Sequence, residues 1–310
     1  MHLLTISRQA HFGDALKTRF EQARSQLEIG HSYCLAVSGV KLLNADQRKF
    51  HQATYLTGLV SLMESLVYDL GFEYLMCYPG RLTGKNIKLD LLSKAGSVGK
   101  IVEELVLKEL NELSYNRFGL FVEDVVNLFN KNVEVDRNLL AELSEVKATR
   151  DVYVHAGGKI NSIYLSKAGD KARSRVVGNE LNLGEDYIRN IEVIFDQFIS
   201  ELEKIVPQKF FESGRATTFK AMWEATCLAK IVPFDKGWFL EGRDMVRPKD
   251  EVVEWRWSDS ERPLLNFFLG IYSEDYPGRN NDVMTALRCW SPETDEGKVM
   301  MSWFDNPFWF

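Results

Sequence analysis

Arg150 and His155 are two residues whose types and spacing fit one chemical task. The segment runs Arg150-Asp151-x-x-x-His155, so the arginine precedes the histidine by five positions. Histidine can accept and donate a proton near neutral pH, and arginine offers a planar, permanently charged group to a phosphate that gains charge. Attack of a ribose 2′-hydroxyl on the adjacent phosphate needs one proton removed and a leaving oxygen protonated, and it adds charge to the phosphate, so these two residue types suit it. Asp151 and His155 are four residues apart, so on a helix their side chains can touch.

The apolar pattern before Arg150 places the arginine on a buried face of a helix. Leu139, Leu143 and Val146 follow one another by four and three residues, and position 150 is the next on that stripe. An arginine on a core-facing stripe is rarely left without a partner, because burying an unpaired charge is expensive. His155 lies about 140° further around an ideal helix. The two side chains therefore meet only if the arginine reaches around, or if a second copy of the segment faces the first.

The elements that must position these residues are helices. Apolar periodicity predicts helices over residues 12–29, 44–78, 97–113 and 117–130, from residue 136 onward, and over 187–205. Asn44 and Gln47 have the spacing of a capping box, and Pro79 must end the helix that they begin. Residues 162–183, rich in glycine and charge, are predicted as a loop or small hairpin with a short strand at 176–177. The fold expected from these elements is mainly α, an up-and-down helical bundle.

These residues and this helix order resemble the HEPN superfamily over residues 10–205. The signature of that family is an arginine followed four to six residues later by a histidine, often with Asn, Asp or His directly after the arginine. Here the segment is followed by Gly157-Gly158, a polar loop and a final helix, and the second helix carries Glu64. Some HEPN toxins carry a tyrosine two residues after the histidine, which a partner nucleotidyltransferase modifies. This chain has Gly157 there, so we do not expect that form of control.

The resemblance implies a helical bundle that pairs about a two-fold axis, so that two such segments line one cleft. Many members are metal-independent endoribonucleases in toxin–antitoxin, CRISPR or anti-phage systems. By this resemblance the chain cleaves RNA as a homodimer or a higher oligomer. His155 is then the acid and base, Arg150 binds the phosphate, and Asp151 orients one of the two.

Four further residues are weaker candidates for this site. Lys147, Tyr153 and Lys159 are candidates for contact with RNA, and Glu64 for holding Arg150 in the cleft. A solvated position for Glu64 is an equal alternative. The alternative for the whole site is a non-catalytic HEPN module, which binds a partner protein or a nucleotide through the same cleft. In that case the Arg150–His155 pair closes the bundle as a structural polar pair.

Composition narrows the classes of function. Hydrophobic residues make up 45% and charged residues 26% of the chain, and the net charge is −6. This acidic balance argues against a broad face for duplex DNA and against docking on anionic membranes, so RNA contact needs a local basic patch. The chain shows no signal peptide and no apolar run of about 18 residues, the minimum for a membrane span. The four cysteines are far apart. We therefore expect a reduced cytoplasmic protein with no metal and no cofactor.

The seven tryptophans all follow residue 207, which predicts a HEPN-like domain over 1–206 and a tryptophan-rich domain over 207–310. The second domain is predicted as a smaller aromatic-rich α+β region, with helices over 217–231 and 262–272 and an edge strand over 252–257. Its aromatic residues could stack bases, as single-strand binders do. A small core or contact with a protein partner is the favoured interpretation. The apolar end, 303–310, is expected to be held down, for example against another subunit.

Overall fold

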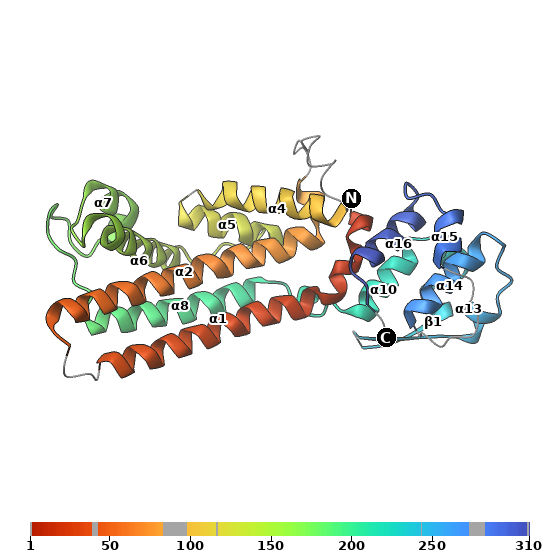
Figure 1. Ribbon diagram of the computed structural model, residues 1–310, viewed down its shortest axis with the longest axis horizontal. Coiled ribbons are helices and arrows are strands. Elements are labelled where there is room, and N and C mark those ends of the chain that lie inside the picture. Colours follow the sequence, from red (N-terminus) through yellow and green to blue (C-terminus); the bar gives the residue numbers. More distant parts are fainter. Residues whose placement is uncertain are drawn as a thin grey trace. The chain divides into compact units, whose positions relative to one another are not determined.

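The protein is described from a computed structural model that covers residues 2–38, 43–82, 98–115, 117–242, 244–272, 283–308 and 310. It is mainly helical (Figure 1). The chain divides into two compact units, which we describe separately. The bundle unit comprises Lys17–Gly71 and Leu110–Pro207, and the aromatic unit comprises Met1–Leu16, Phe72–Glu109 and Gln208–Phe310. The predicted domains, 1–206 and 207–310, are continuous stretches of sequence. The two units are instead sets of residues that contact one another, drawn from separate segments of the chain. The division into two domains at residue 207 therefore stays a prediction.

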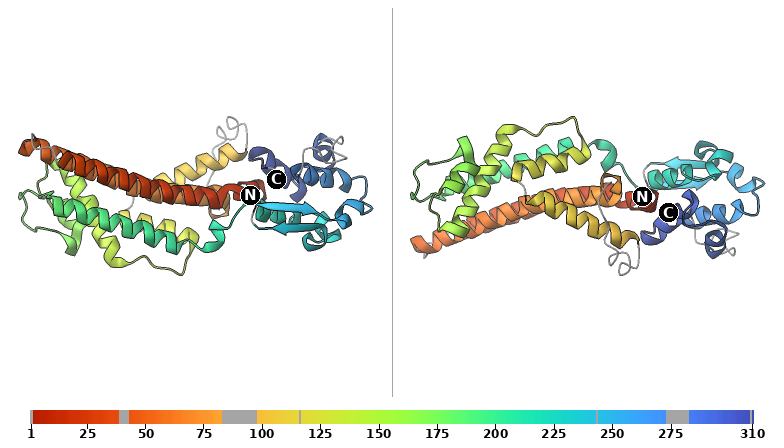
Figure 2. Two further views of the ribbon diagram at one scale, coloured as in Figure 1. Left: turned by 90° about the horizontal axis from the view of Figure 1, so that it is seen from below. Right: turned by 90° about the horizontal axis from the view of Figure 1, so that it is seen from above.

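The bundle unit is built from helices of very different lengths. They are α1 (Gln9–Ser38), α2 (Ala45–Cys77), α4 (Val98–Ser114), α5 (Phe118–Phe129), α6 (Arg137–Ala156), α7 (Ser162–Ala168), the 3-10 turn η4 (Gly169–Lys171) and α8 (Glu185–Ile205). The first three of these helices also contribute residues to the aromatic unit. Helices α1 and α2 run antiparallel and α8 lies along α1 (Figures 1 and 2). Ion pairs from Arg24 of α1 to Asp196 and Glu203 of α8 follow this arrangement.

The predicted limits of α2 are confirmed by its hydrogen bonds. The backbone N–H of Gln47 donates to Asn44 Oδ1 at 2.8 Å, and the N–H of Asn44 donates to Gln47 Oε1 at 2.9 Å. This reciprocal pair is the capping box that the sequence predicts. The helix ends at Cys77, before Pro79, whose ring cannot continue it.

Helix α6, which carries Arg150 and His155, has a signal at each end. The Asp136 side chain accepts from the N–H of Asn138 and caps the first turn. At the other end Gly157 takes a left-handed conformation with φ of 58°, and its N–H bonds to the carbonyl of Val152. A residue with a Cβ would be strained there, so the glycine fixes the end of the helix directly after Ala156.

Residues 157–184 differ from the predicted loop or hairpin. They contain helix α7 and turn η4, and the only β contact between the described residues of this segment is a single bridge between Lys159 and Glu180. The Asn161 side chain caps α7 by accepting from the N–H of Tyr164. A small apolar cluster holds the segment against α6; it consists of Ala148, Val152, Ile160, Tyr164, Ala168 and Leu181. Helix α7 was not predicted because it is too short for its apolar periodicity to be recognised and because glycines surround it.

The aromatic unit contains short elements. They are η1 (His2–Leu4), η2 (Ile6–Arg8), η3 (Pro79–Leu82), α9 (Gln208–Phe211), α10 (Arg215–Glu224), α11 (Leu228–Ile231), α12 (Phe234–Gly237), β1 (Trp238–Glu241), β2 (Met245–Pro248), α13 (Asp250–Glu254), α14 (Glu261–Tyr272), α15 (Val283–Cys289) and α16 (Asp295–Asp305). Strands β1 and β2 pair antiparallel, with Trp238 opposite Pro248 and Glu241 opposite Met245. The combination of helices and a small sheet agrees with the predicted α+β character.

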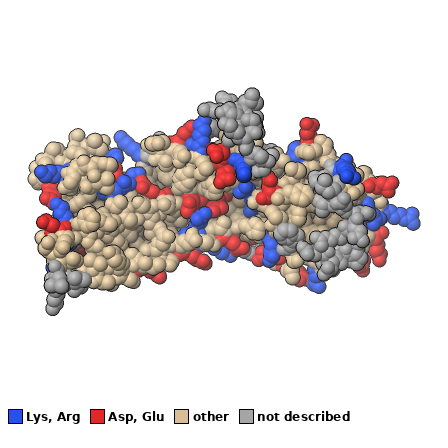
Figure 3. All heavy atoms as spheres, viewed as in Figure 1, with Lys and Arg blue, Asp and Glu red and all other residues tan. Residues whose placement is uncertain are grey.

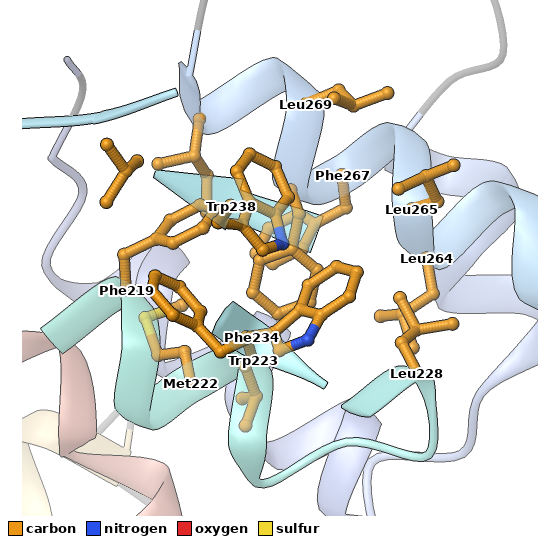
Figure 4. Packing of buried hydrophobic residues seen from close by; sticks show 14 of the residues in the cluster. Phe219, Met222, Trp223, Leu228, Phe234, Trp238, Leu264, Leu265, Phe267 and Leu269 are labelled. Atoms are coloured by element: carbon orange, nitrogen blue, oxygen red, sulfur yellow. The ribbon is translucent and has the colours of Figure 1, made fainter. Parts of the chain in front are cut away.

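Tryptophans fill the core of the aromatic unit. Trp223, Trp238 and Trp257 are all buried there, and the rings of Phe219 and Trp238 meet edge to face with centroids 4.7 Å apart (Figure 4). Trp255 is different, because 48% of its surface is exposed. For the three buried tryptophans, the prediction of a packed core is confirmed. Trp309 lies outside the described residues.

The predicted edge strand over 252–257 is wrong. Residues 250–254 form helix α13, and the strands lie before it. The sequence alternates apolar Val253, Trp255 and Trp257 with charged residues, which imitates a strand, but Trp255 is exposed whereas Trp257 is buried. Asp250 and Glu251 stand in the first turn of α13, where acidic side chains favour a helix.

The end of the chain is held down, as expected. The Trp303 indole N–H donates to the carbonyl of Phe308 at 2.9 Å, and the Phe308 side chain is buried. The rings of Phe310 and Phe219 are 5.5 Å apart. Among the described residues, no helix combines the length and apolar character needed to cross a membrane.

Candidate functional site

Arg150 lies where the apolar stripe of α6 ends. Leu139, Leu143 and Val146 are buried, and the Arg150 side chain, next on the stripe, is 19% exposed. A guanidinium so placed needs partners, because it gives up most of its water. The prediction that Arg150 is paired is confirmed by the contacts that follow.

Two carboxylates hold Arg150. One terminal nitrogen, Nη2, donates to Glu64 Oε2 at 3.1 Å, and the other, Nη1, lies 3.4 Å from Asp151 Oδ1. The remaining donor, Nε, is buried and has no hydrogen-bond partner among the described residues. Of the two alternatives for Glu64, the contact with Arg150 is therefore found. It joins helix α2 to helix α6 within the bundle unit.

Two lysines extend these contacts. Lys147 Nζ pairs with the other oxygen of Glu64, Oε1, and Lys167 Nζ of α7 pairs with Asp151 Oδ2 at 2.8 Å. We call these five residues, Glu64, Lys147, Arg150, Asp151 and Lys167, the Glu64 cluster. Three cations share two carboxylates in it, so its formal charge is 3 − 2 = +1. In this acidic chain the cluster is a local site with a positive excess.

His155 does not join the Glu64 cluster. It lies in the last turn of α6, exposed to solvent, and its side chain makes no hydrogen bond or ion pair with any described residue. The Asp151 carboxylate, one turn earlier, is occupied by Arg150 and Lys167. Within one chain, therefore, the structure gives His155 no orienting contact with Asp151 or Arg150.

Tyr153 and Lys159 lie elsewhere. The Tyr153 hydroxyl donates to the carbonyl of Leu181, and burial raises the pKa of this phenol. Lys159 is exposed and its backbone forms the bridge to Glu180. Tyr153 thus anchors the segment that follows α6. Of the three candidates for contact with RNA, only Lys147 lies in the Glu64 cluster.

A hollow of about 330 Å³ opens beside Glu64 and Lys147. Its lining comes from α2, α4, α5 and α6 and includes Glu64, Ser65, Tyr68, Asp69, Ser114, Phe121 and Lys147. This volume is at the lower end of the range for ligand pockets. Burial raises the pKa of Asp69, and Arg19 at 3.3 Å opposes that shift. Among the described residues, no group of three or more His, Cys, Asp or Glu side chains could hold a metal ion.

Helix α6 carries a second polar cluster, around the buried Glu145, that was not predicted from the sequence. Oε1 of Glu145 accepts from the hydroxyls of Thr149 at 2.7 Å and Tyr164 at 2.9 Å and from Arg173 Nε at 3.0 Å, and Oε2 accepts from Tyr187 at 2.8 Å. The Arg173 guanidinium also lies 3.5 Å from the centroid of the Tyr187 ring. We call these five residues the Glu145 cluster.

The Glu145 cluster has the character of a structural anchor. It connects α6 and α8 to α7 and the segment after it, and all of its charged groups are paired. Burial and the Glu145 carboxylate raise the pKa of Tyr187 well above 10.0. One feature of the sequence could have indicated this cluster. Ala148 and Val152 are small apolar residues that share a helix face with Glu145, and they indicate that this face is buried.

Charged residues on the face shown in Figure 3 alternate in sign. Blue Lys and Arg and red Asp and Glu are interspersed over the described part of that face. This mixture agrees with the net charge of −6. A polyanion would therefore need a local contact such as the Glu64 cluster.

Comparison with known proteins found no matching family model, no matching curated protein and no matching solved structure.

Proposed function

We propose that this protein is a HEPN-type endoribonuclease that cleaves RNA without a metal ion and acts as a homodimer. The observation that carries the proposal is the placing of Arg150 and His155 on the last turns of one helix. Arg150 lies in a local group of positive excess, and His155 is open to solvent. A role in toxin or anti-phage defence, in the cytoplasm, follows from the HEPN resemblance alone.

The proposed chemistry divides the work between the two residues. The His155 imidazole would remove the proton of the ribose 2′-hydroxyl or protonate the leaving 5′-oxygen. Arg150 would stabilise the phosphate as its charge increases, aided by the nearby Lys147 ammonium. The products would be a 2′,3′-cyclic phosphate end and a 5′-hydroxyl end.

A homodimer is part of the proposal because one chain does not bring the two groups together. His155 contacts neither Arg150 nor Asp151, and it lies about 140° around the helix from Arg150. A second copy across a two-fold axis would set each His155 near the other copy's segment. The exposed Val154, between the two faces, would lie in that interface.

One observation favours a second candidate, a non-catalytic HEPN module that binds a partner protein or a nucleotide. Arg150 is held by both Glu64 and Asp151, which is how a structural arginine is commonly paired. His155 has no orienting partner, whereas a catalytic histidine usually has one. The two candidates can be distinguished by RNA cleavage, because only the nuclease cuts RNA.

Cleavage of total RNA in the presence of EDTA tests the nuclease. We expect the wild type to produce 2′,3′-cyclic phosphate ends and His155→Ala to be at least about a hundredfold slower, the usual contribution of a general acid or base. His11→Ala is the matched control, because His11 is also exposed on a helix. A His155→Ala protein as active as His11→Ala contradicts the proposed role of His155.

A further inference from the structure

Two cations of α6 converge on one carboxylate. Lys147 Nζ pairs with Oε1 of Glu64 and Arg150 Nη2 with Oε2, so each oxygen has its own cation. The non-ester oxygens of a phosphodiester can be bound in the same way by two cations. The two residues are three apart on the helix, which places their side chains on neighbouring positions.

The rest of the Glu64 cluster cannot replace Glu64 as a counter-charge. Asp151 already pairs with Lys167 and with the other terminal nitrogen of Arg150. Without the Glu64 carboxylate, three cations would face one anion, a formal charge of 3 − 1 = +2. Such a group attracts an anion more strongly than the closed cluster does.

We propose that Lys147 and Arg150 form a binding site for a phosphate of single-stranded RNA, and that Glu64 occupies this site until the phosphate displaces it. The assignment to RNA rests on the proposed function. The chemistry of the site is that of a phosphate oxyanion. Glu64 is then an internal competitor, which lowers affinity for any weak polyanion.

The surroundings allow the exchange. Glu64 is 31% exposed on its side chain, and the hollow of about 330 Å³ lies directly beside it. The Ser65 hydroxyl lines that hollow and can donate to a displaced carboxylate, whereas the hydroxyls of Tyr68 and Ser114, which also line it, already donate to Asn111.

The Lys147 ammonium would keep its place during the exchange. It lies 5.4 Å from the centroid of the Phe118 ring, a cation–π contact that does not depend on Glu64. Asp69 lines the same hollow and would repel a phosphate from its own side of it. The phosphate is therefore expected on the α6 side, between Lys147 and Arg150.

Binding of a short single-stranded RNA with methylated 2′-hydroxyls tests the proposal, because this RNA cannot be cleaved. Fluorescence anisotropy at low salt measures Kd for wild type, Glu64→Gln and Glu142→Gln. Glu142 is a matched control: it pairs with one lysine, Lys171 at 3.0 Å, and its side chain is 28% exposed. We expect Glu64→Gln to bind about tenfold more tightly than the wild type and Glu142→Gln to change Kd by less than about twofold.

Further variants complete the test. Adding Lys147→Ala to Glu64→Gln should remove most of the tighter binding, and Glu64→Ala provides a second variant if Glu64→Gln is poorly folded. Inorganic phosphate should compete with the RNA in Glu64→Gln at lower concentration than in the wild type. If only free phosphate binds the opened site and RNA does not, RNA as the source of the phosphate is wrong. Equal affinity of Glu64→Gln and Glu142→Gln for RNA and for phosphate overturns the site itself.

Cleavage separates this inference from the proposed function. If Glu64→Gln binds RNA more tightly but no variant cleaves ordinary RNA, the phosphate site is supported and the nuclease is rejected. If the wild type cleaves RNA but Glu64→Gln binds it no more tightly, the nuclease is supported and Glu64 is rejected as a competitor of the RNA phosphate.

Discussion

Helix α6 carries two polar clusters on different faces, and they differ in how their charges are satisfied. In the Glu145 cluster one buried carboxylate accepts from four side chains. In the Glu64 cluster two carboxylates share three cations, every side chain is at least 19% exposed, and Arg150 Nε has no hydrogen-bond partner in the described part of the chain. The buried cluster therefore fixes the position of α6, while the more exposed cluster retains charge that is available to a ligand.

Removal of the Glu145 carboxylate gives the largest expected change in stability. Glu145→Ala leaves the Arg173 charge without its carboxylate and the hydroxyls of Tyr164 and Tyr187 without their acceptor. Breaking a buried ion pair in this way costs about 3 kcal/mol. Urea unfolding followed by circular dichroism measures the loss. A loss under about 1 kcal/mol would show that the cluster is not an anchor.

Tyr187→Phe removes one donor from the same cluster and has an intermediate effect of about 1 kcal/mol at neutral pH. It should also change the dependence on alkaline pH. The folded-state pKa of Tyr187 is raised above 10.0, so its contribution to stability is complete below pH 10.0 and is lost as the pH rises beyond it. The variant should lose less stability than the wild type between neutral pH and pH values above 10.0. Equal losses would contradict the assignment of this pKa shift.

Arg150→Gln has the smallest expected effect on folding, below about 1 kcal/mol, because neither carboxylate loses its last partner. Glu64 keeps Lys147 and Asp151 keeps Lys167. Thermal unfolding measures this change, and RNA cleavage measures the function in the same samples. A stability loss as large as that of Glu145→Ala would make Arg150 a structural residue and would favour the non-catalytic alternative.

The sequence was sufficient where one helix face repeats over many turns. Helix α2 was predicted because its apolar steps and the Asn44–Gln47 cap agree with each other. The stripe through Leu143 and Val146 likewise placed Arg150 at the edge of the core and indicated that it needs a partner. Glu64 was named as one candidate partner, although the spacing along the chain could not decide between that contact and a solvated position.

The sequence was insufficient where contacts between distant segments decide. Ala148 and Val152 indicate that the Glu145 face of the helix is buried, but the partners of Glu145 are Tyr164, Tyr187 and Arg173, which lie far along the chain and cannot be identified from its spacing. Helix α7 is too short for its periodicity to be evident, and strands β1 and β2 have only one buried residue each. The proposed resemblance to the HEPN family likewise rests on one short segment and an order of helices.

Buried contacts within the aromatic unit join the beginning of the chain to its end. The N–H of Ser7 donates to Ser302 Oγ at 2.9 Å, and both residues are buried. During synthesis on the ribosome, residue 7 leaves the exit tunnel long before residue 302 is made. The segments 1–16 and 72–109 of the aromatic unit must then wait for 208–310 before its core can close, whereas every residue of the bundle unit has been translated by position 207. On a nascent chain the bundle unit can therefore be complete while the aromatic unit still exposes apolar surface to chaperones.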